Sequence, residues 1–347
     1  MDALGRLLDD SSGLTEEMPR LNDTAPESAA ESRRQIISVR SLPDRFFRGL
    51  TRTAAVAVLG VMALIGLFLL LKSTQAWRRV GLSFLTEQTW FPDVGVFGIS
   101  AVLLGTVLIA LVALVVAVPV AFGAAVFISE YATPGLRRPL ISLVDLMAAI
   151  PSIVYGLWGL FFLQPRIISL SRWLSVHAGW FPPFKVSGSA ASNYTSSTFI
   201  AGLVVSLMVI PIVCSLMREV FSQAPVGERE AALALGATRW GMIRTVVIPF
   251  GKGGMIGATM LGMGRALGET VGVYLIISPI FTRSTRILES GSNSIAALIA
   301  NRYQESSSFG IAALMAAGLV LFLMTLIINA LASVIVSRSR SGALTEI

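Results

Sequence analysis

An arginine and a glutamate lie four residues apart within a long apolar stretch, in the sequence Gly262-Met-Gly-Arg-Ala-Leu-Gly-Glu-Thr270. If this stretch is helical, the spacing places Arg265 and Glu269 on one face of the helix, roughly in mid-membrane. An ionised side chain at the centre of a bilayer costs at least ~2.5–3.5 kcal/mol. Both side chains are therefore expected to face protein or water rather than lipid.

Two interpretations of this pair remain open. In the first, Arg265 and Glu269 form an ion pair within the helix that neutralises itself, although desolvating both charges can exceed their mutual attraction. In the second, Arg265, Glu269 and Thr270 line a hydrated substrate pathway. The forked guanidinium would then bind a passing oxyanion, while Glu269 holds the arginine in place and weakens its grip on the cargo.

The elements that must position these residues are long apolar helices. Six stretches are long enough to cross a hydrocarbon core of ~30 Å, which takes ~20 helical residues. Each must be helical because lipid cannot satisfy an open backbone. The sequence therefore predicts an all-α integral membrane protein with six transmembrane helices, at about 54–71, 99–128, 139–163, 199–216, 254–280 and 309–336.

The third of these stretches contains an acid and a proline six residues apart, Asp145 and Pro151. Proline removes one helical hydrogen bond and frees a carbonyl, so a kink is expected at this position. We interpret Asp145 and Pro151 as a candidate gate, with a packing role for Asp145 as the equal alternative.

Composition and charge agree with a membrane protein. The chain has 347 residues, of which 54% are hydrophobic, and a net charge of +7. The basic residues are concentrated before the first stretch, between the second and third, between the fourth and fifth, and after the sixth. This bias predicts a multi-pass protein of the plasma or inner membrane with both termini in the cytosol, and it explains the positive charge without nucleic acid.

The remaining boundaries follow from the polar ends of the chain. Residues 1–45 are too polar to fold and are predicted to be a disordered cytosolic tail. Residues 46–340 are predicted to be the membrane domain, and residues 341–347 a second cytosolic tail.

A single cysteine, Cys214, excludes an internal disulfide and a thiolate metal cluster, and the only histidine, His177, has no second ligand nearby. No metal site and no cofactor are predicted.

A polar helix–turn–helix is predicted between the fourth and fifth stretches, within residues 217–251. Pro225 suits a first helical turn, and Gly236 can end that helix because glycine adopts a left-handed conformation without steric cost. Thr238 can cap a second helix that presents Trp240, Ile243 and Val247 on one face and ends at Pro249. Such a compact unit suits a groove in a partner protein.

This loop resembles the coupling loop of ABC-importer permeases, whose pattern is E-A-A-x3-G-x9-I-x-L-P. The matching residues are Glu230, Ala231, Ala232, Gly236 and Pro249, with Val246 and Ile248 as conservative replacements and Trp240 on the apolar face between them. In that family the loop inserts into a cytosolic ATPase subunit. The resemblance implies the same role for residues 217–251.

Two further segments narrow the resemblance to PstC-type permeases of phosphate importers. These are Gly264-Arg-Ala-Leu-Gly-Glu-Thr270 and Ile150-Pro-Ser-Ile-Val-Tyr-Gly-Leu-Trp-Gly-Leu160; the sequence departs from many relatives after Thr270. The resemblance implies a PstA-like second permease subunit, a PstB-like ATPase dimer, an extracytoplasmic phosphate-binding protein, and phosphate as substrate. The chain has no G-x-x-x-x-G-K-[ST] loop, so it is predicted to be non-catalytic and to leave ATP hydrolysis to a partner.

Other functions fit some of these features. A permease for molybdate, sulfate or phosphonate is one alternative, because one arginine does not distinguish oxyanions. An ion-coupled secondary transporter, with Asp145, Arg265 and Glu269 relaying protons, is another, but it leaves the coupling loop unexplained. A membrane scaffold explains the charges inside the membrane least well.

Overall fold

The computed structural model describes residues 42–339, and the side chains of residues 46–334. The chain divides into two units, Met1–Leu59 and Gly60–Ile347. The described part of the first unit is the beginning of helix α1 (Leu42–Val80), with exposed apolar side chains such as Leu50 and Val56. The predicted tail at 1–45 lies outside the described residues up to residue 41, as does the predicted tail at 341–347.

The second unit is almost entirely helical. Its elements after α1 are β1 (Trp90–Phe91), β2 (Val96–Phe97), α2 (Ser100–Val126), α3 (Pro134–Ala149), α4 (Ser152–Trp158), α5 (Gln164–His177), α6 (Thr198–Ser222), α7 (Val226–Ala234), α8 (Arg239–Met242), α9 (Ile248–Gly268), α10 (Val271–Ile276), α11 (Ile295–Arg302) and α12 (Ser308–Ser339). The two short strands pair antiparallel, with Trp90 opposite Phe97. Short 3-10 and π-helical turns join several of these helices.

Six helical stretches among the described residues are long and apolar enough to cross a membrane. They are Phe46–Leu85, Ser100–Tyr131, Ser152–His177, Thr198–Ser222, Arg239–Gly268 and Ser308–Val334. The predicted all-α class with six membrane helices is confirmed. The third stretch differs from the one predicted, as described below.

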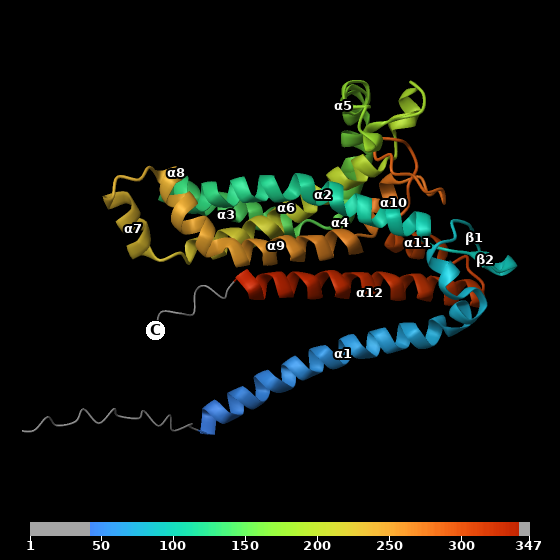
Figure 1. The fold of residues 1–347 in the computed structure, drawn as a ribbon, viewed down its shortest axis with the longest axis horizontal. Helices are drawn as coiled ribbons and strands as arrows, with labels where there is room; N and C mark the ends of the chain where they lie inside the picture. Colours follow the sequence, from blue (N-terminus) through green and yellow to red (C-terminus); the bar gives the residue numbers. More distant parts are fainter. Residues whose placement is uncertain (1–41, 340–347) are drawn as a thin grey trace, which may run out of the picture. The chain divides into compact units, whose positions relative to one another are not determined.

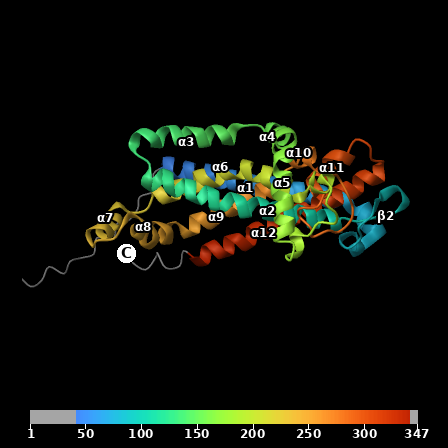
Figure 2. The same ribbon diagram turned by 90° about the horizontal axis from the view of Figure 1, so that it is seen from above.

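Helices α2, α6, α9 and α12 run side by side in the second unit (Figures 1 and 2). Helices α7 and α8 lie at one end of this bundle, which we call the α7 end. The β1–β2 hairpin and α11 lie at the opposite end, which we call the hairpin end. The candidate pathway residues and the loop that resembles a coupling loop are therefore held by one bundle.

Helices α2 and α6 approach each other closely in the core. Ala113, Ala117, Ala121 and Ala125 recur every four residues on one face of α2 and are completely buried. On α6, a Cβ added at Gly202 would lie 2.5 Å from Cγ1 of Val112. Small side chains let helix backbones approach closely where lipid gives no hydrophobic driving force. The α2–α6 pair is therefore the tightly packed centre of the unit.

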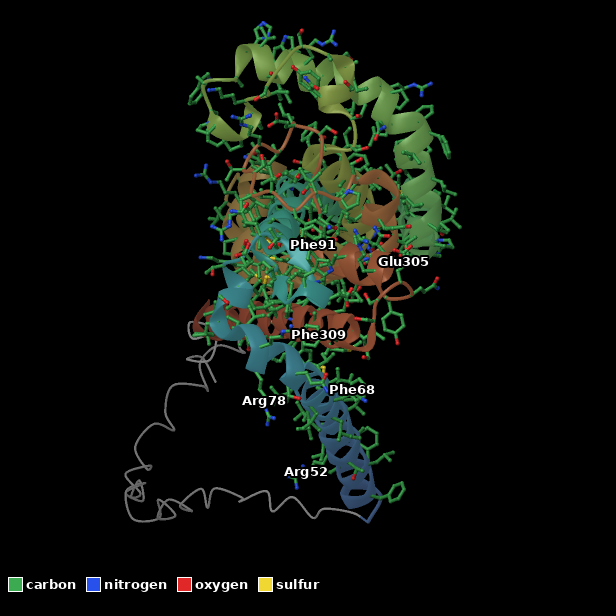
Figure 3. The ribbon with its side chains drawn as sticks, turned by 90° about the vertical axis from the view of Figure 1, so that its right-hand side faces the viewer. Arg52, Phe68, Arg78, Phe91, Glu305 and Phe309 are labelled. Carbon is green, nitrogen blue, oxygen red and sulfur yellow. The ribbon has the colours of Figure 1, made fainter. Side chains whose placement is uncertain are left out.

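Aromatic packing closes the hairpin end. Phe97 of β2 is completely buried and meets Phe84 and Phe309 edge-to-face, with ring centroids 5.7 Å and 5.5 Å apart. Figure 3 views the molecule from this side, with Phe91 of the hairpin and Phe309 of α12 labelled. Edge-to-face geometry aligns the positive ring edge with the negative ring face. The first residues of α12 are thereby fixed to the hairpin.

Polar side chains link the loops at the hairpin end. Nε of Arg283 donates to Oγ of Ser100 at 3.0 Å, and the guanidinium also donates to the carbonyl of Thr86. The backbone N–H groups of Gln88 and Thr89 and the Thr89 hydroxyl donate to Glu87, and these bonds hold the pKa of its carboxyl below the usual value. The loops before α2 and before α11 are thus joined at the start of α2.

The predicted third span, 139–163, is wrong as a single helix. Helix α3 ends at Ala149, Ile150 and Pro151 are both extended, and a new helix begins at Ser152. The residue before a proline is disfavoured in the helical region, so Pro151 forces Ile150 out of the helix and produces a complete break rather than a kink. The helix that is long enough to cross a membrane runs from Ser152 to His177.

Candidate substrate pathway and coupling loop

Arg265 lies in the last turn of α9 and is exposed within this chain. It lines a pocket of about 380 Å³ together with Ile212 of α6, Asn329 of α12, and Met260, Leu261 and Gly264 of its own helix. Within the described residues, its guanidinium has neither an ion pair nor a hydrogen bond. A guanidinium in a membrane helix without a protein counter-charge requires water or an anion. Asn329 adds an amide to the same pocket, and no pattern in the sequence had identified it.

The predicted pairing of Arg265 with Glu269 is wrong. Helix α9 ends at Gly268, and the backbone of Glu269 is extended, so the two side chains do not share a helix face. The Glu269 carboxylate is buried, at 9% exposure, and accepts a hydrogen bond from the backbone N–H of Gly272 at 3.3 Å. It therefore caps the short helix α10, and the Thr270 hydroxyl donates to the carbonyl of Gly268. A place for Glu269 and Thr270 on the substrate pathway stays a prediction.

The helices that follow the two breaks in the chain, α4 and α10, pack against each other. A Cβ added at Gly156 in α4 would lie 3.1 Å from Cα of Gly272 in α10, so the helices that follow the two breaks pack glycine to glycine. The Tyr155 hydroxyl donates to the carbonyl of Met147 at 2.9 Å and thereby bridges the break at Ile150 and Pro151. Irregular backbone at membrane depth is tolerated where it is buried in protein or lines a cavity.

The structure leaves the candidate gate as a prediction. Pro151 is located at the break, while Asp145 is exposed on α3. No basic group of the described residues forms an ion pair with Asp145. The structure does not bring Asp145 together with Arg265.

The helix–turn–helix at the α7 end is confirmed in its central features. Gly236 has φ +85°, and the N–H groups of Gly236 and Ala237 donate to the carbonyls of Leu233 and Ala232, as in a Schellman motif. Oγ1 of Thr238 accepts from the N–H of Gly241 at 3.1 Å and caps α8. The turn is therefore set by one left-handed glycine and one capping threonine.

Two details of this loop were predicted wrongly. Pro249 does not end the second helix, because α8 continues through a π-helical turn at Ile243–Val247 into α9, and Pro249 lies in the first turn of α9. The π turn shifts the pairing to i→i+5 and so accommodates the missing N–H of proline. Trp240 does not share the buried face of Ile243 and Val247, since it is 52% exposed.

The solvent side of the loop carries an apolar surface. Leu235, directly before the turn, is 89% exposed, and Val226, Leu233 and Trp240 are also exposed. Glu230 and Ala231 lie exposed between them, whereas Ala232 packs against the core. Exposed apolar side chains grouped on a short polar loop favour an interaction site.

A buried ion pair behind this surface was missed from the sequence. Nη1 of Arg229 in α7 lies 3.2 Å from Oε2 of Glu130, which belongs to the π-helical turn at Phe127–Tyr131 after α2. The two residues are 99 positions apart. Charged residues next to apolar stretches are too common for the sequence to show which of them form a pair.

These features define a class of protein. A bundle of membrane-crossing helices contains a pocket with an arginine that has no ion-pair partner among the described residues, and one end carries a compact loop with exposed apolar side chains. This is the organisation of a transport permease that depends on partner subunits.

Comparisons with known proteins give the family. Residues 117–341 match the family model "Binding-protein-dependent transport system inner membrane component". The chain belongs to this family. It is a non-catalytic, multi-pass inner-membrane component of an ABC importer. Importers of this class work with an ATPase and a binding protein. Membership in the family excludes the two alternative functions, a membrane scaffold and an ion-coupled secondary transporter.

Named relatives and solved structures agree with this result. The chain is 39% identical over 303 residues to "Phosphate transport system permease protein PstC 2" of Mycobacterium tuberculosis, covering 86% of this chain and 93% of the relative. It is 38% identical to PstC of Pasteurella multocida, covering 85% and 92%. A bacterial alginate ABC transporter in complex with its alginate-bound periplasmic protein shares the fold, with a TM-score of 0.54 at 17% identity over 88% of this chain and 99% of that one.

Proposed function

We propose that this chain is the permease subunit of an ATP-driven importer of inorganic phosphate. It forms the translocation pathway with a PstA-like second permease and is driven by a PstB-like ATPase dimer. A phosphate-binding protein delivers the substrate on the opposite side of the membrane. Both termini and the coupling loop, residues 217–251, lie in the cytosol, as the distribution of basic residues favours.

The assignment of the substrate depends on the guanidinium of Arg265, which has no partner in the described part of the chain and lies in a pocket between three membrane helices. A forked cation suits a tetrahedral oxyanion because it offers two parallel donors. Named relatives that match over more than nine-tenths of their length are phosphate permeases, which selects phosphate among the oxyanions. Molybdate, sulfate and phosphonate are the alternative substrates, and competition during uptake separates them from phosphate.

The second permease is supported by the uncovered face of α9. Leu261 and Arg265 are exposed on this helix, and a Cβ added at Gly257 or Gly268 would meet no atom of the described residues within 4 Å. A face that combines glycines with a charged arginine is unsuited to lipid. A second helical subunit that closes the pathway satisfies both features.

The ATPase is supported by the exposed apolar surface of Leu235 and Trp240 at the turn of the coupling loop. Closure of the ATPase dimer would move this loop and switch the pathway from outward-facing to inward-facing. Such a switch is a two-state change driven by different contacts in the two states.

Co-purification tests the proposed assembly. The tagged chain, extracted from its own membrane with a mild detergent, is expected to bring down a second permease and an ATPase subunit, identified by mass spectrometry. As a matched control, Leu235→Glu should lose the ATPase subunit and keep the second permease, because the charge falls on the apolar surface of the loop. Recovery of the chain without any ATPase subunit would contradict the proposed function.

A further inference from the structure

Helix α7 is attached to the bundle by very few side chains. None of its nine residues is completely buried. Ala232 packs against the core, and Arg229 forms the ion pair with Glu130 at 3.2 Å. Nη2 of Arg229 also donates to the carbonyl of Phe221. One guanidinium therefore joins α7 to the ends of two other helices.

Those two helices are the pair with the closest packing in the unit. Glu130 lies in the π-helical turn that follows α2, and Phe221 lies in the last turn of α6. Phe221 is completely buried, and its ring meets Phe122 of α2 edge-to-face at 6.0 Å. A displacement of Arg229 consequently acts on α2 and α6 together.

Stability alone does not explain why an ion pair is buried at this position. The side chains of Arg229 and Glu130 are only 19% and 4% exposed, and Nε of Arg229 and Oε1 of Glu130 are buried without a hydrogen-bond partner in the described part of the chain. Apolar side chains of similar volume often stabilise a protein as well as a buried ion pair does. What a guanidinium adds is two directed bonds, one to each helix.

We infer that Arg229 and Glu130 are positioning residues that transmit movement of the coupling loop to α2 and α6. The inference rests on the proposed function, since it requires an ATPase that moves the loop. Arg229 takes the displacement of α7, and its two bonds pass that displacement to the ends of both helices. The π-helical turn at Phe127–Tyr131 gives α2 a place where its register adjusts.

The test uses the complete complex in proteoliposomes with the phosphate-binding protein, and it measures phosphate uptake per ATP hydrolysed. The variants are Arg229→Gln, Arg229→Lys and the exchange Glu130→Arg with Arg229→Glu. Arg302→Gln is the matched control, because Arg302 forms an exposed ion pair with Glu305 at the opposite end of the bundle. ATPase bound per permease is measured for each variant by quantitative mass spectrometry.

Arg229→Gln is expected to keep the ATPase subunit bound and to lower uptake per ATP about tenfold or more, within the ~5–150-fold range of couplings between sites. Arg229→Lys retains the charge but lacks the two-pronged guanidinium that bonds both helices. Its uptake per ATP should therefore lie between that of Arg229→Gln and that of the unmodified complex. The charge exchange should recover part of the loss, and Arg302→Gln should leave the ratio unchanged.

Unchanged uptake per ATP in Arg229→Gln would overturn the inference. The inference would also be overturned if all three variants yielded less folded chain while the folded complex kept an unchanged uptake per ATP. That result would show that the pair serves stability. Failure of the unmodified complex to bind an ATPase would instead contradict the proposed function, whatever the variants do.

Discussion

Replacement of Arg265 by glutamine is expected to reduce phosphate uptake about 30-fold or more while the complex still assembles. The charge pair in question is Arg265 with the bound phosphate. Removing one partner of a desolvated charge pair costs about 2–5 kcal/mol, and each 1.4 kcal/mol corresponds to a factor of ten. Glutamine keeps most of the side-chain length and hydrogen-bonding capacity but lacks the positive charge. Uptake of labelled phosphate and recovery of partner subunits are measured on the same membranes.

Two controls separate this effect from a loss of structure. Arg265→Lys keeps the charge without the bidentate fork and should retain an intermediate rate. Arg302→Gln removes an exposed arginine that does not line this pocket and should transport normally. Full uptake by Arg265→Gln would return Arg265 to a structural role.

Replacement of Gly236 by valine is expected to leave the chain in the membrane but to abolish coupled uptake. Gly236 has φ +85°, and a left-handed conformation costs an L-residue about 1–2 kcal/mol, with β-branched residues affected most. A Cβ there meets no atom within 4 Å in the part of the chain that the structure describes, so the effect comes from the backbone and not from a clash. The turn between α7 and α8 would open and displace the apolar surface at Leu235.

Gly227 provides a matched comparison for this substitution. A Cβ at Gly227 also meets no described atom within 4 Å, but the φ of Gly227 is not left-handed. Gly227→Val should therefore retain uptake, and Gly236→Asn should retain more than Gly236→Val because asparagine tolerates the left-handed region. Normal uptake with normal ATPase binding in Gly236→Val would count against a coupling role for the loop.

Features that depend on neighbouring residues were predictable from the sequence. The apolar stretches gave the number of membrane helices, since hydrophobic length is a local property. The turn at Gly236 and the cap at Thr238 followed from the backbone preferences of two residues. Proline also indicated an irregularity at Pro151, but the sequence predicted a kink and not the complete break that the structure shows.

Three other features were not predictable from local sequence patterns. The end of α9 at Gly268 has no proline to signal it, although the N–H of Gly272 donates to the Glu269 carboxylate where the next helix begins. Pro249 falls inside a continuous helix because a π turn precedes it. The Arg229–Glu130 pair joins residues 99 positions apart, so no local pattern contains it.

The most direct test of the account is uptake of labelled phosphate into proteoliposomes that contain the purified complex. ATP is supplied on the coupling-loop side and the loaded binding protein on the other side. We predict uptake that requires ATP, that survives collapse of the proton gradient by an uncoupler, and that excess sulfate or molybdate does not displace. Uptake that proceeds without ATP and stops when the uncoupler is added would contradict it.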